Sequence, residues 1–304
     1  MAPFSGQTLA PPPPSFFKRT QFGAEALGFS TLAALITRLG PDRASAISGA
    51  AWQRLAPFNK RHARAEAQMR AGVPDLGDAE IAANLHEMWG NLGRTTAEAF
   101  HIGALIADQD RFRIGEDTRD AIRDAKTRGA VFVSLHQGNW ELAAPLLNHL
   151  GLPVAGVYQK LQNPLVEAKA SLFRSPYYGL GLYSKGNEAA RQLLKIVGNR
   201  GTVAIMADLR DLSGVAVPFF GQPAPSTGFP ALLARGRDVP LYAGVVFRED
   251  GATFRIRTME IPVSRSGDRE TDIVETTAAI QRCFEAYVRE KPGQWMWGHR
   301  RWRR

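Results

Sequence analysis

A histidine and a glutamate stand five residues apart in the segment SLHQGNWELAAP, residues 134–145. His136 directly follows the apolar run AVFVSL, which predicts a buried strand, and Glu141 falls in the expected first turn of the next helix. The carboxyl ends of strands are where α/β proteins bind ligands. A carboxylate that accepts from one imidazole nitrogen leaves the other nitrogen free as a base. The pattern predicts acid–base catalysis; the structural alternative is a strand-ending His and a Glu that favours a helix N-terminus.

The second part of the chain alternates between expected strands and helices. Further strands are expected in PVAGVYQ, TVAIMAD and PLYAGVVFRED. Helices are expected over DTRDAIRDAKTRG and roughly over 163–174, 187–199, 227–236 and 270–290. This alternation predicts an α/β fold with a mixed central sheet flanked by helices.

The first part of the chain is expected to be a flexible proline-rich lead over residues 1–20 and a helical part over 21–110. An α/β core with a basic, aromatic tail then fills 111–304. The helix expected at roughly 21–39 is marginal against the roughly 20 apolar residues of a spanning helix. It is interpreted as a membrane-contacting helix in preference to a buried core helix, and a signal peptide is the weakest alternative.

The composition favours an anionic partner, because the formal net charge is +9 and the pI is about 10.0. Nucleic acid, an acidic membrane surface, an acidic protein and a phosphorylated substrate all satisfy this charge. The single cysteine, Cys283, excludes an intrachain disulfide and is interpreted as a core residue. The sequence has no Walker-type loop and no His-Glu-x-x-His spacing, so neither a metal nor a cofactor is expected.

The chain ends in QWMWGHRRWRR, where tryptophans and arginines alternate. Arginine recognises phosphate through paired hydrogen bonds, and tryptophan favours the membrane interface. Arg300 and Arg301 are therefore candidates for binding an anionic substrate, a carrier protein or the membrane. The alternative is a solvated basic tail, which the cost of exposing tryptophan disfavours.

HQGNWE resembles the signature of the late acyltransferases of lipid A biosynthesis, the lauroyl and myristoyl transferases. These enzymes belong to the lysophospholipid acyltransferase superfamily with its His-x4-Asp/Glu motif. The resemblance continues in order through the apolar N-terminal helix, QNPLVE (162–167), the Asp208 region, VPFFGQPAPSTGFPALLARG (217–236) and the tail. Several motifs in one order make it far more specific than any single motif.

By this resemblance His136 is the catalytic base and Glu141 is its partner carboxylate. Arg174 and Asp208 match family residues of the site and become candidate substrate-binding residues, like Arg300 and Arg301. The alternatives are a surface role for Arg174 and a turn-capping role for Asp208.

The chain departs from the family pattern at two places. Asp208-Leu209-Arg210 stands where members often have Asp-Gln-Asp, and Gln137 stands where an aromatic residue is common. The proline-rich segment at 217–236 is interpreted equally as a groove for the acyl chain and as an ordinary packed loop.

The resemblance implies an O-acyltransferase at the cytoplasmic face of the bacterial inner membrane. Its donor would be an acyl carrier protein thioester and its acceptor a hydroxyl of a lipid A precursor, with no cofactor and no nucleic acid. Another glycolipid acceptor, such as a phosphatidylinositol mannoside, is the first alternative. A basic nucleic-acid-binding module, with the tail tryptophans stacking on bases, is the second.

Overall fold

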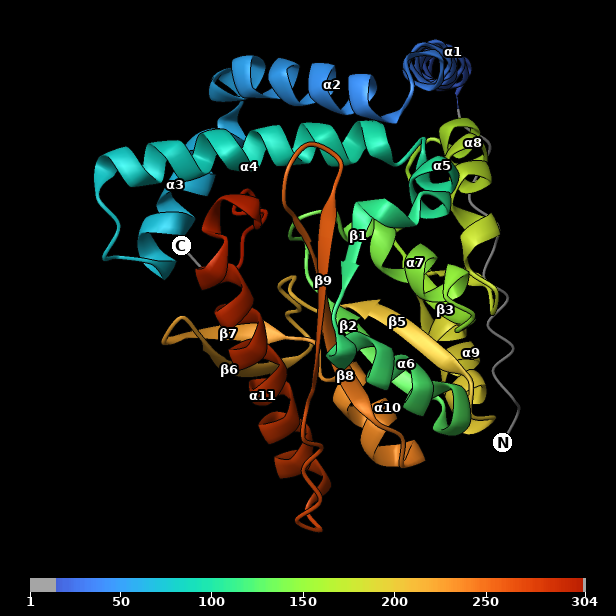
Figure 1. Ribbon diagram of the computed structural model, residues 1–304, viewed down its shortest axis with the longest axis vertical. Coiled ribbons are helices and arrows are strands. Elements are labelled where there is room, and N and C mark those ends of the chain that lie inside the picture. The colour runs from blue at the N-terminus through green and yellow to red at the C-terminus, as the bar shows by residue number, and fades with distance from the viewer. Residues whose placement is uncertain (1–14, 303–304) are drawn as a thin grey trace.

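The computed structural model describes residues 15–302, and its centre is a seven-stranded sheet (Figure 1). The strand order is β1-β9-β8-β2-β5-β3-β4. The strands from β8 to β4 run parallel, whereas β9 is antiparallel to β8 and β1 is parallel to β9. The expected mixed sheet is therefore confirmed. The strands are β1 (Phe112–Ile114), β2 (Ala130–Ser134), β3 (Val154–Tyr158), β4 (Leu182–Ser184), β5 (Thr202–Met206), β8 (Leu241–Arg248) and β9 (Phe254–Glu260).

Helices cover both faces of the sheet. Alternate residues of a strand point to opposite sides, and here the apolar residues on both sides need to be covered. Phe132 of β2 packs on the face covered by α6 (Glu116–Arg128) and α7 (Ala143–His149). Val131 and Val133 pack on the other face. That face is covered by α9 (Asn187–Gly198), α10 (Phe229–Arg237) and α11 (Arg269–Glu290). The apolar run after residue 129 is thus a strand buried on both sides, as its sequence predicts.

The helical part that precedes the sheet packs over one end of it. Helix α2 lies along α4, above the sheet in the view of Figure 1. The proline-rich lead lies outside the described residues as far as residue 14, and the first helix begins at Phe16. The helices are α1 (Phe16–Leu39), α2 (Pro41–Leu55), α3 (Lys60–Gly72), α4 (Asp78–Glu98) and α5 (Ile102–Ala107).

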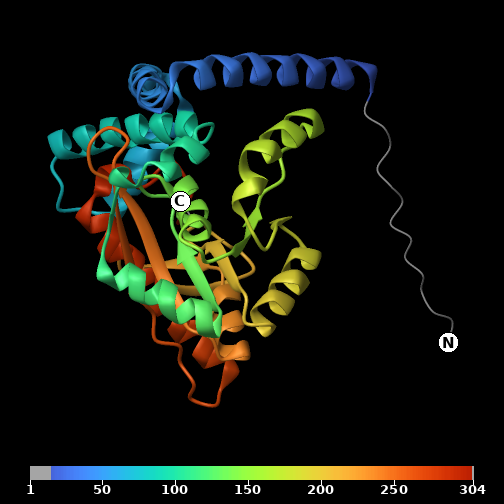
Figure 2. The same ribbon diagram turned by 45° about the vertical axis from the view of Figure 1, so that its right-hand side comes forward.

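Helix α1 lies at the edge of the molecule and packs against α8 (Pro164–Arg174) (Figure 2). The side-chain amide of Asn163 donates to the Phe22 carbonyl oxygen (3.0 Å) and to Glu25 Oε2 (2.8 Å). Lys169 Nζ donates to Ser30 Oγ over 2.6 Å. These bonds fix α1 to the helix that ends at Arg174.

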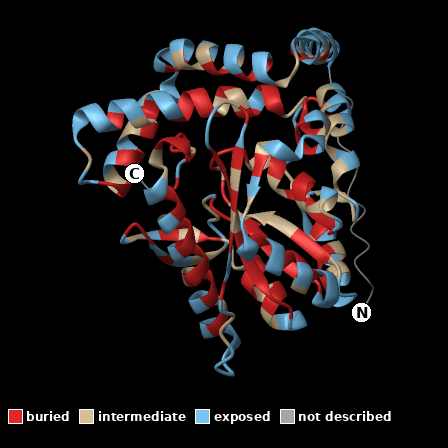
Figure 3. Ribbon diagram, viewed as in Figure 1, coloured by how far each residue is buried: buried red, intermediate tan, exposed pale blue. Residues whose placement is uncertain are grey.

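Most of α1 is exposed, so its interpretation as a buried core helix does not fit the structure (Figure 3). Its buried residues are Ala26, Ala33 and Ile36. None of the helices within residues 15–302 is long and apolar enough to cross a membrane. The large apolar side chains that α1 exposes are Phe16, Phe17, Leu27, Leu32, Leu35 and Leu39.

The proline-rich segment is a hairpin rather than a loop. Strands β6 (Val215–Phe219) and β7 (Gln222–Ser226) pair antiparallel outside the main sheet. Phe219 and Phe220 pack against Trp297 and Trp302 of the C-terminal segment. As far as Trp302, the C-terminal segment is therefore folded into the core, so its tryptophans are buried and avoid the free-energy cost of exposure. Cys283 is buried in the same cluster, as predicted.

Candidate active site

His136 and Asp208 meet because their strands are paired in register. Ser134 of β2 lies opposite Met206 of β5 in a parallel pair, and each site residue stands two positions further on. Asp208 Oδ1 accepts from His136 Nδ1–H over 2.8 Å, and Oδ2 accepts from the His136 backbone N–H over 2.9 Å. Trp295 Nε1–H donates to Oδ2 as well, over 2.9 Å. The aspartate thus fixes both the ring and the main chain of His136.

The charges at this contact support each other. Burial lowers the pKa of His136, but the charge and hydrogen bond of Asp208, with a further contribution from the Glu141 charge, raise that pKa above 6.5 overall. Burial raises the pKa of Asp208. The charge and hydrogen bonds of His136, with the hydrogen bond of Trp295, lower this pKa by more, so it lies well below the usual carboxyl range. Asp208 is therefore an ionised group, 1% exposed, that stabilises the imidazolium form of His136.

Glu141 does not make the hydrogen bond that the sequence motif suggested. Its Oε1 accepts from Arg174 Nη2 over 3.0 Å, and Asp208 instead occupies the Nδ1 side of His136. The reason is the turn between His136 and Glu141, which places the glutamate opposite the end of α8. Arg174 thus belongs to the site through Glu141, and both side chains are partly exposed.

The turn after His136 is held by close backbone contacts. Gly138 has φ +57°, and a Cβ there would lie 1.8 Å from the Val246 carbonyl oxygen of β8, so only glycine fits. Asn139 N–H donates to that same oxygen over 2.9 Å. Asn91 Nδ2 of α4 donates to the Gly138 carbonyl oxygen over 2.8 Å. The motif residues Gly138 and Asn139 therefore have structural roles.

A buried ion pair supports the same turn from α4. Glu98 is fully buried and accepts from Arg248 Nη1 (2.6 Å) and Nη2 (2.7 Å). Glu98 Oε2 also accepts from Asn139 Nδ2 over 2.6 Å. This pair could not be predicted from the sequence, because 150 residues separate Glu98 from Arg248 and neither lies in a recognisable motif.

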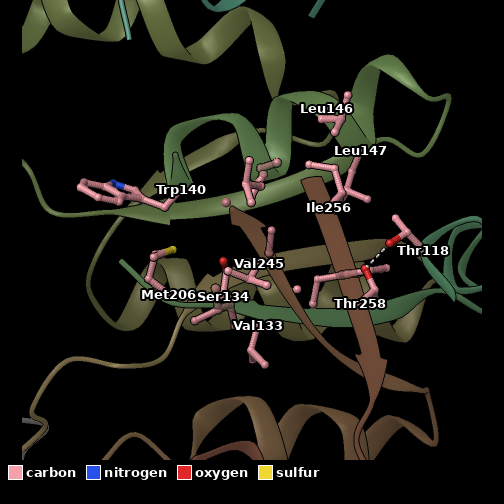
Figure 4. Close-up of a pocket in the computed structure, with 18 of the residues that line it drawn as sticks. Thr118, Val133, Ser134, Trp140, Leu146, Leu147, Met206, Val245, Ile256 and Thr258 are labelled. Carbon is pink, nitrogen blue, oxygen red and sulfur yellow. Dashed lines mark hydrogen bonds between the residues drawn. The ribbon is translucent and has the colours of Figure 1, made fainter. Parts of the chain in front are cut away.

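An apolar pocket lies between the sheet and α7 (Figure 4). The space inside it is about 740 Å³ when the adjoining open solvent is included. Trp140 marks the end near the site, since its ring centroid lies 5.3 Å from that of His136. The hydroxyl of Ser134 lines the pocket and, among the described residues, has no hydrogen-bond partner. The remaining lining is mostly aliphatic and includes Leu146, Leu147, Val157, Ala204, Ile205, Met206 and Val245.

The two tail arginines have different surroundings from each other, and only Arg301 departs from the expected exposure. Arg301 is 1% exposed, and its guanidinium donates to the Pro225 carbonyl oxygen, Ser226 Oγ and Gln281 Oε1. It therefore cannot bind a substrate without leaving the core. Arg300 is exposed and so remains accessible to an external anion.

The residues at 15–302 contain no cluster of three or more His, Cys, Asp or Glu side chains able to hold a metal ion. His299, which the sequence analysis did not assign, lies with its ring centroid 5.2 Å from that of His136. The site thus consists of one imidazole fixed by Asp208, a glutamate–arginine pair, a second imidazole and an apolar pocket.

An imidazole held by a buried carboxylate, near an apolar pocket, is an arrangement that an acyltransferase can use. The chain belongs to the bacterial lipid A biosynthesis acyltransferase family, whose model matches residues 18–304. A search among curated proteins found no match.

Proposed function

We propose that this acyltransferase moves a fatty acyl chain from an acyl carrier protein thioester to a hydroxyl of a lipid A precursor. The observation that carries the proposal is the His136–Asp208 contact beside the apolar pocket. The Nδ1–H of His136 is engaged by Asp208, while Nε2 has no partner among the described residues. That nitrogen is available as the base.

The proposed reaction needs no acyl-enzyme. His136 Nε2 takes the proton of the acceptor hydroxyl as its oxygen attacks the thioester carbonyl carbon. The tetrahedral intermediate then collapses, the C–S bond breaks, and the thiolate receives the proton from Nε2. Asp208 stabilises the imidazolium that exists between these two steps.

The pocket suits the acyl chain of the donor. Its wall is apolar, and it begins at Trp140 beside His136, so a chain lying in it would bring its thioester to the imidazole. In this proposal the Ser134 hydroxyl, which lines the pocket and has no partner among the described residues, donates to the carbonyl oxygen on which negative charge develops.

The exposed apolar residues of α1 support attachment to the cytoplasmic face of the inner membrane. A helix that presents leucine and phenylalanine to the outside, with Lys18 and Arg19 in its first turn, suits an anionic bilayer surface. Such a surface would bring the enzyme to its lipid acceptor.

The test is transfer by the purified protein from an acyl carrier protein thioester to a lipid A precursor, read by mass spectrometry. We expect the acceptor to gain the mass of one acyl chain. In a strain that lacks the gene, the corresponding lipid should lack that chain. The acceptor assignment would be wrong if another lipid, such as a mannosylated phosphoinositide, gained the chain while the lipid A precursor did not.

A further inference from the structure

Two arginines on α3 lie beside the site and have no ion-pair partner within residues 15–302. Arg61 and Arg64 occur three residues apart near the start of the helix, and Gln68 follows one turn later on the same side. Gln68 Oε1 accepts from the backbone N–H groups of Arg301 (3.0 Å) and Trp302 (3.3 Å). This side of α3 therefore runs along the C-terminal segment that carries His299.

His299 connects that segment to the catalytic base. Its ring lies 5.2 Å from that of His136, and its pKa is lowered to about 4. Burial is the largest cause, followed by the charge of His136; Arg61 and Arg64 lower the pKa further, against the effect of Asp208. The charges of both guanidinium groups therefore act on His299.

The charge of these arginines is not compensated locally. The first turn of α3 contains no acidic residue, and the positive end of the helix dipole adds to the cationic field. Glu66, the acidic residue of this helix, is engaged by Arg70 over 2.9 Å. Arg61 is exposed and Arg64 is half-buried, so both remain accessible to a ligand.

We propose that Arg61 and Arg64 bind a phosphate group of the acceptor lipid and so hold its hydroxyl at His136. This inference rests on the proposed function. Two neighbouring guanidinium groups can form paired, charge-assisted hydrogen bonds to one phosphate. The donor chain occupies the side of His136 next to Trp140, which leaves the side formed by His299 and α3 for the acceptor. This subsite replaces the role that the sequence suggested for the buried Arg301.

The experiment compares Arg61→Gln/Arg64→Gln with Arg269→Gln/Arg282→Gln, which removes the same charge from exposed positions of α11. The KM for a phosphorylated lipid A precursor should rise about 10- to 100-fold in the first pair, from the loss of charged hydrogen bonds. The KM for the acyl thioester and the value of kcat should change little. Arg61→Lys/Arg64→Lys should retain most of the affinity, and the effect should shrink in high salt.

A second acceptor separates phosphate binding from a general loss of structure. With a dephosphorylated precursor, wild type and the Arg61→Gln/Arg64→Gln variant should have the same KM. An unchanged KM for the phosphorylated acceptor, or an equal rise for both acceptors, would overturn the subsite. A rise in the KM for the carrier-bound donor, absent with a short thioester that lacks phosphopantetheine, would assign the arginines to the donor instead.

A binding measurement makes the subsite independent of turnover. The probe is the soluble bisphosphorylated glucosamine disaccharide without acyl chains, titrated into wild type and both arginine pairs by calorimetry. Weaker binding by the α3 variant alone supports the subsite. If wild type binds this probe but transfers no acyl chain to any lipid A precursor, the proposed function fails while the subsite stands.

Discussion

Asp208 binds His136 at two points, through the ring Nδ1–H and through the backbone N–H, although 72 residues separate them. Trp295 holds the same carboxylate from a third direction. The His136 ring is therefore fixed by a residue that follows the neighbouring strand β5, not by the glutamate of its own motif.

The first prediction concerns the base itself. His136→Ala should lower kcat by about 100- to 10,000-fold, because the acceptor hydroxyl loses its proton acceptor. Transfer measured by mass spectrometry checks this, with the melting temperature as the control for folding. Near-normal turnover by a folded variant would remove His136 from the mechanism.

The second prediction is a pH dependence. Transfer requires neutral His136, so kcat/KM should rise with pH through the raised pKa of this group, above 6.5. Asp208→Asn removes the charge that favours the imidazolium, so the pKa falls and the acid limb should move to lower pH. The activity at the plateau should fall as well, because the ring loses its fixed orientation. An acid limb that stays in place would show that another group controls it.

The third prediction concerns Glu141 and Arg174. Their hydrogen bond implies that they act as a unit, so Glu141→Gln/Arg174→Gln should lose little more activity than the worse single variant. A double-variant cycle in kcat/KM measures this coupling. Losses that simply multiply would mean that the two residues act separately and would favour a direct action of Glu141 on His136.

The fourth prediction concerns chain length. Ala204→Leu on β5 adds bulk to the pocket wall and should shift the preference towards shorter acyl donors. Ala216→Leu, at an exposed position of the β6–β7 hairpin, is the matched control and should keep the wild-type preference. A competition among thioesters of different length provides the measurement. An unchanged ranking in Ala204→Leu would place the acyl chain elsewhere.

The fifth prediction concerns membrane contact. Replacing Leu27, Leu32 and Leu35 by Gln should weaken binding to vesicles that contain anionic lipid, because these side chains supply exposed apolar area. Val274→Gln, at an exposed apolar position of α11, should have no effect. Cosedimentation compares the variants. If all the proteins sedimented equally with the vesicles, the membrane contact would have to lie on another surface.

The main fold was predictable because its signals are local. The run AVFVSL and the strands at TVAIMAD and PLYAGVVFRED follow from uninterrupted apolar residues, and they form β2, β5 and β8. Strand β9 was missed, although FRIRTME alternates buried residues with half-buried arginines, a pattern typical of a half-buried strand. The hairpin β6–β7 was interpreted as a loop, because its prolines disfavour a ladder and are tolerated here outside the main sheet.

The partner of His136 could not be read from spacing. Both Glu141 and Asp208 follow a strand, and only the pairing of β2 with β5 decides which carboxylate reaches the ring. The tail posed the same problem. Its arginines suggested an exposed surface, whereas Trp295 and Arg301 contact residues more than 70 positions away.

Helix α8 is fixed at both ends by groups of different origin. Asn163 at its start is bonded to α1, and Arg174 at its end is bonded to Glu141. Because α8 is bonded at both ends, a shift of its first residue is coupled to a shift of its last. We therefore expect the seating of α1 to set the position of Arg174, so that detergent micelles and flat bilayers give different kinetic constants for the same polypeptide.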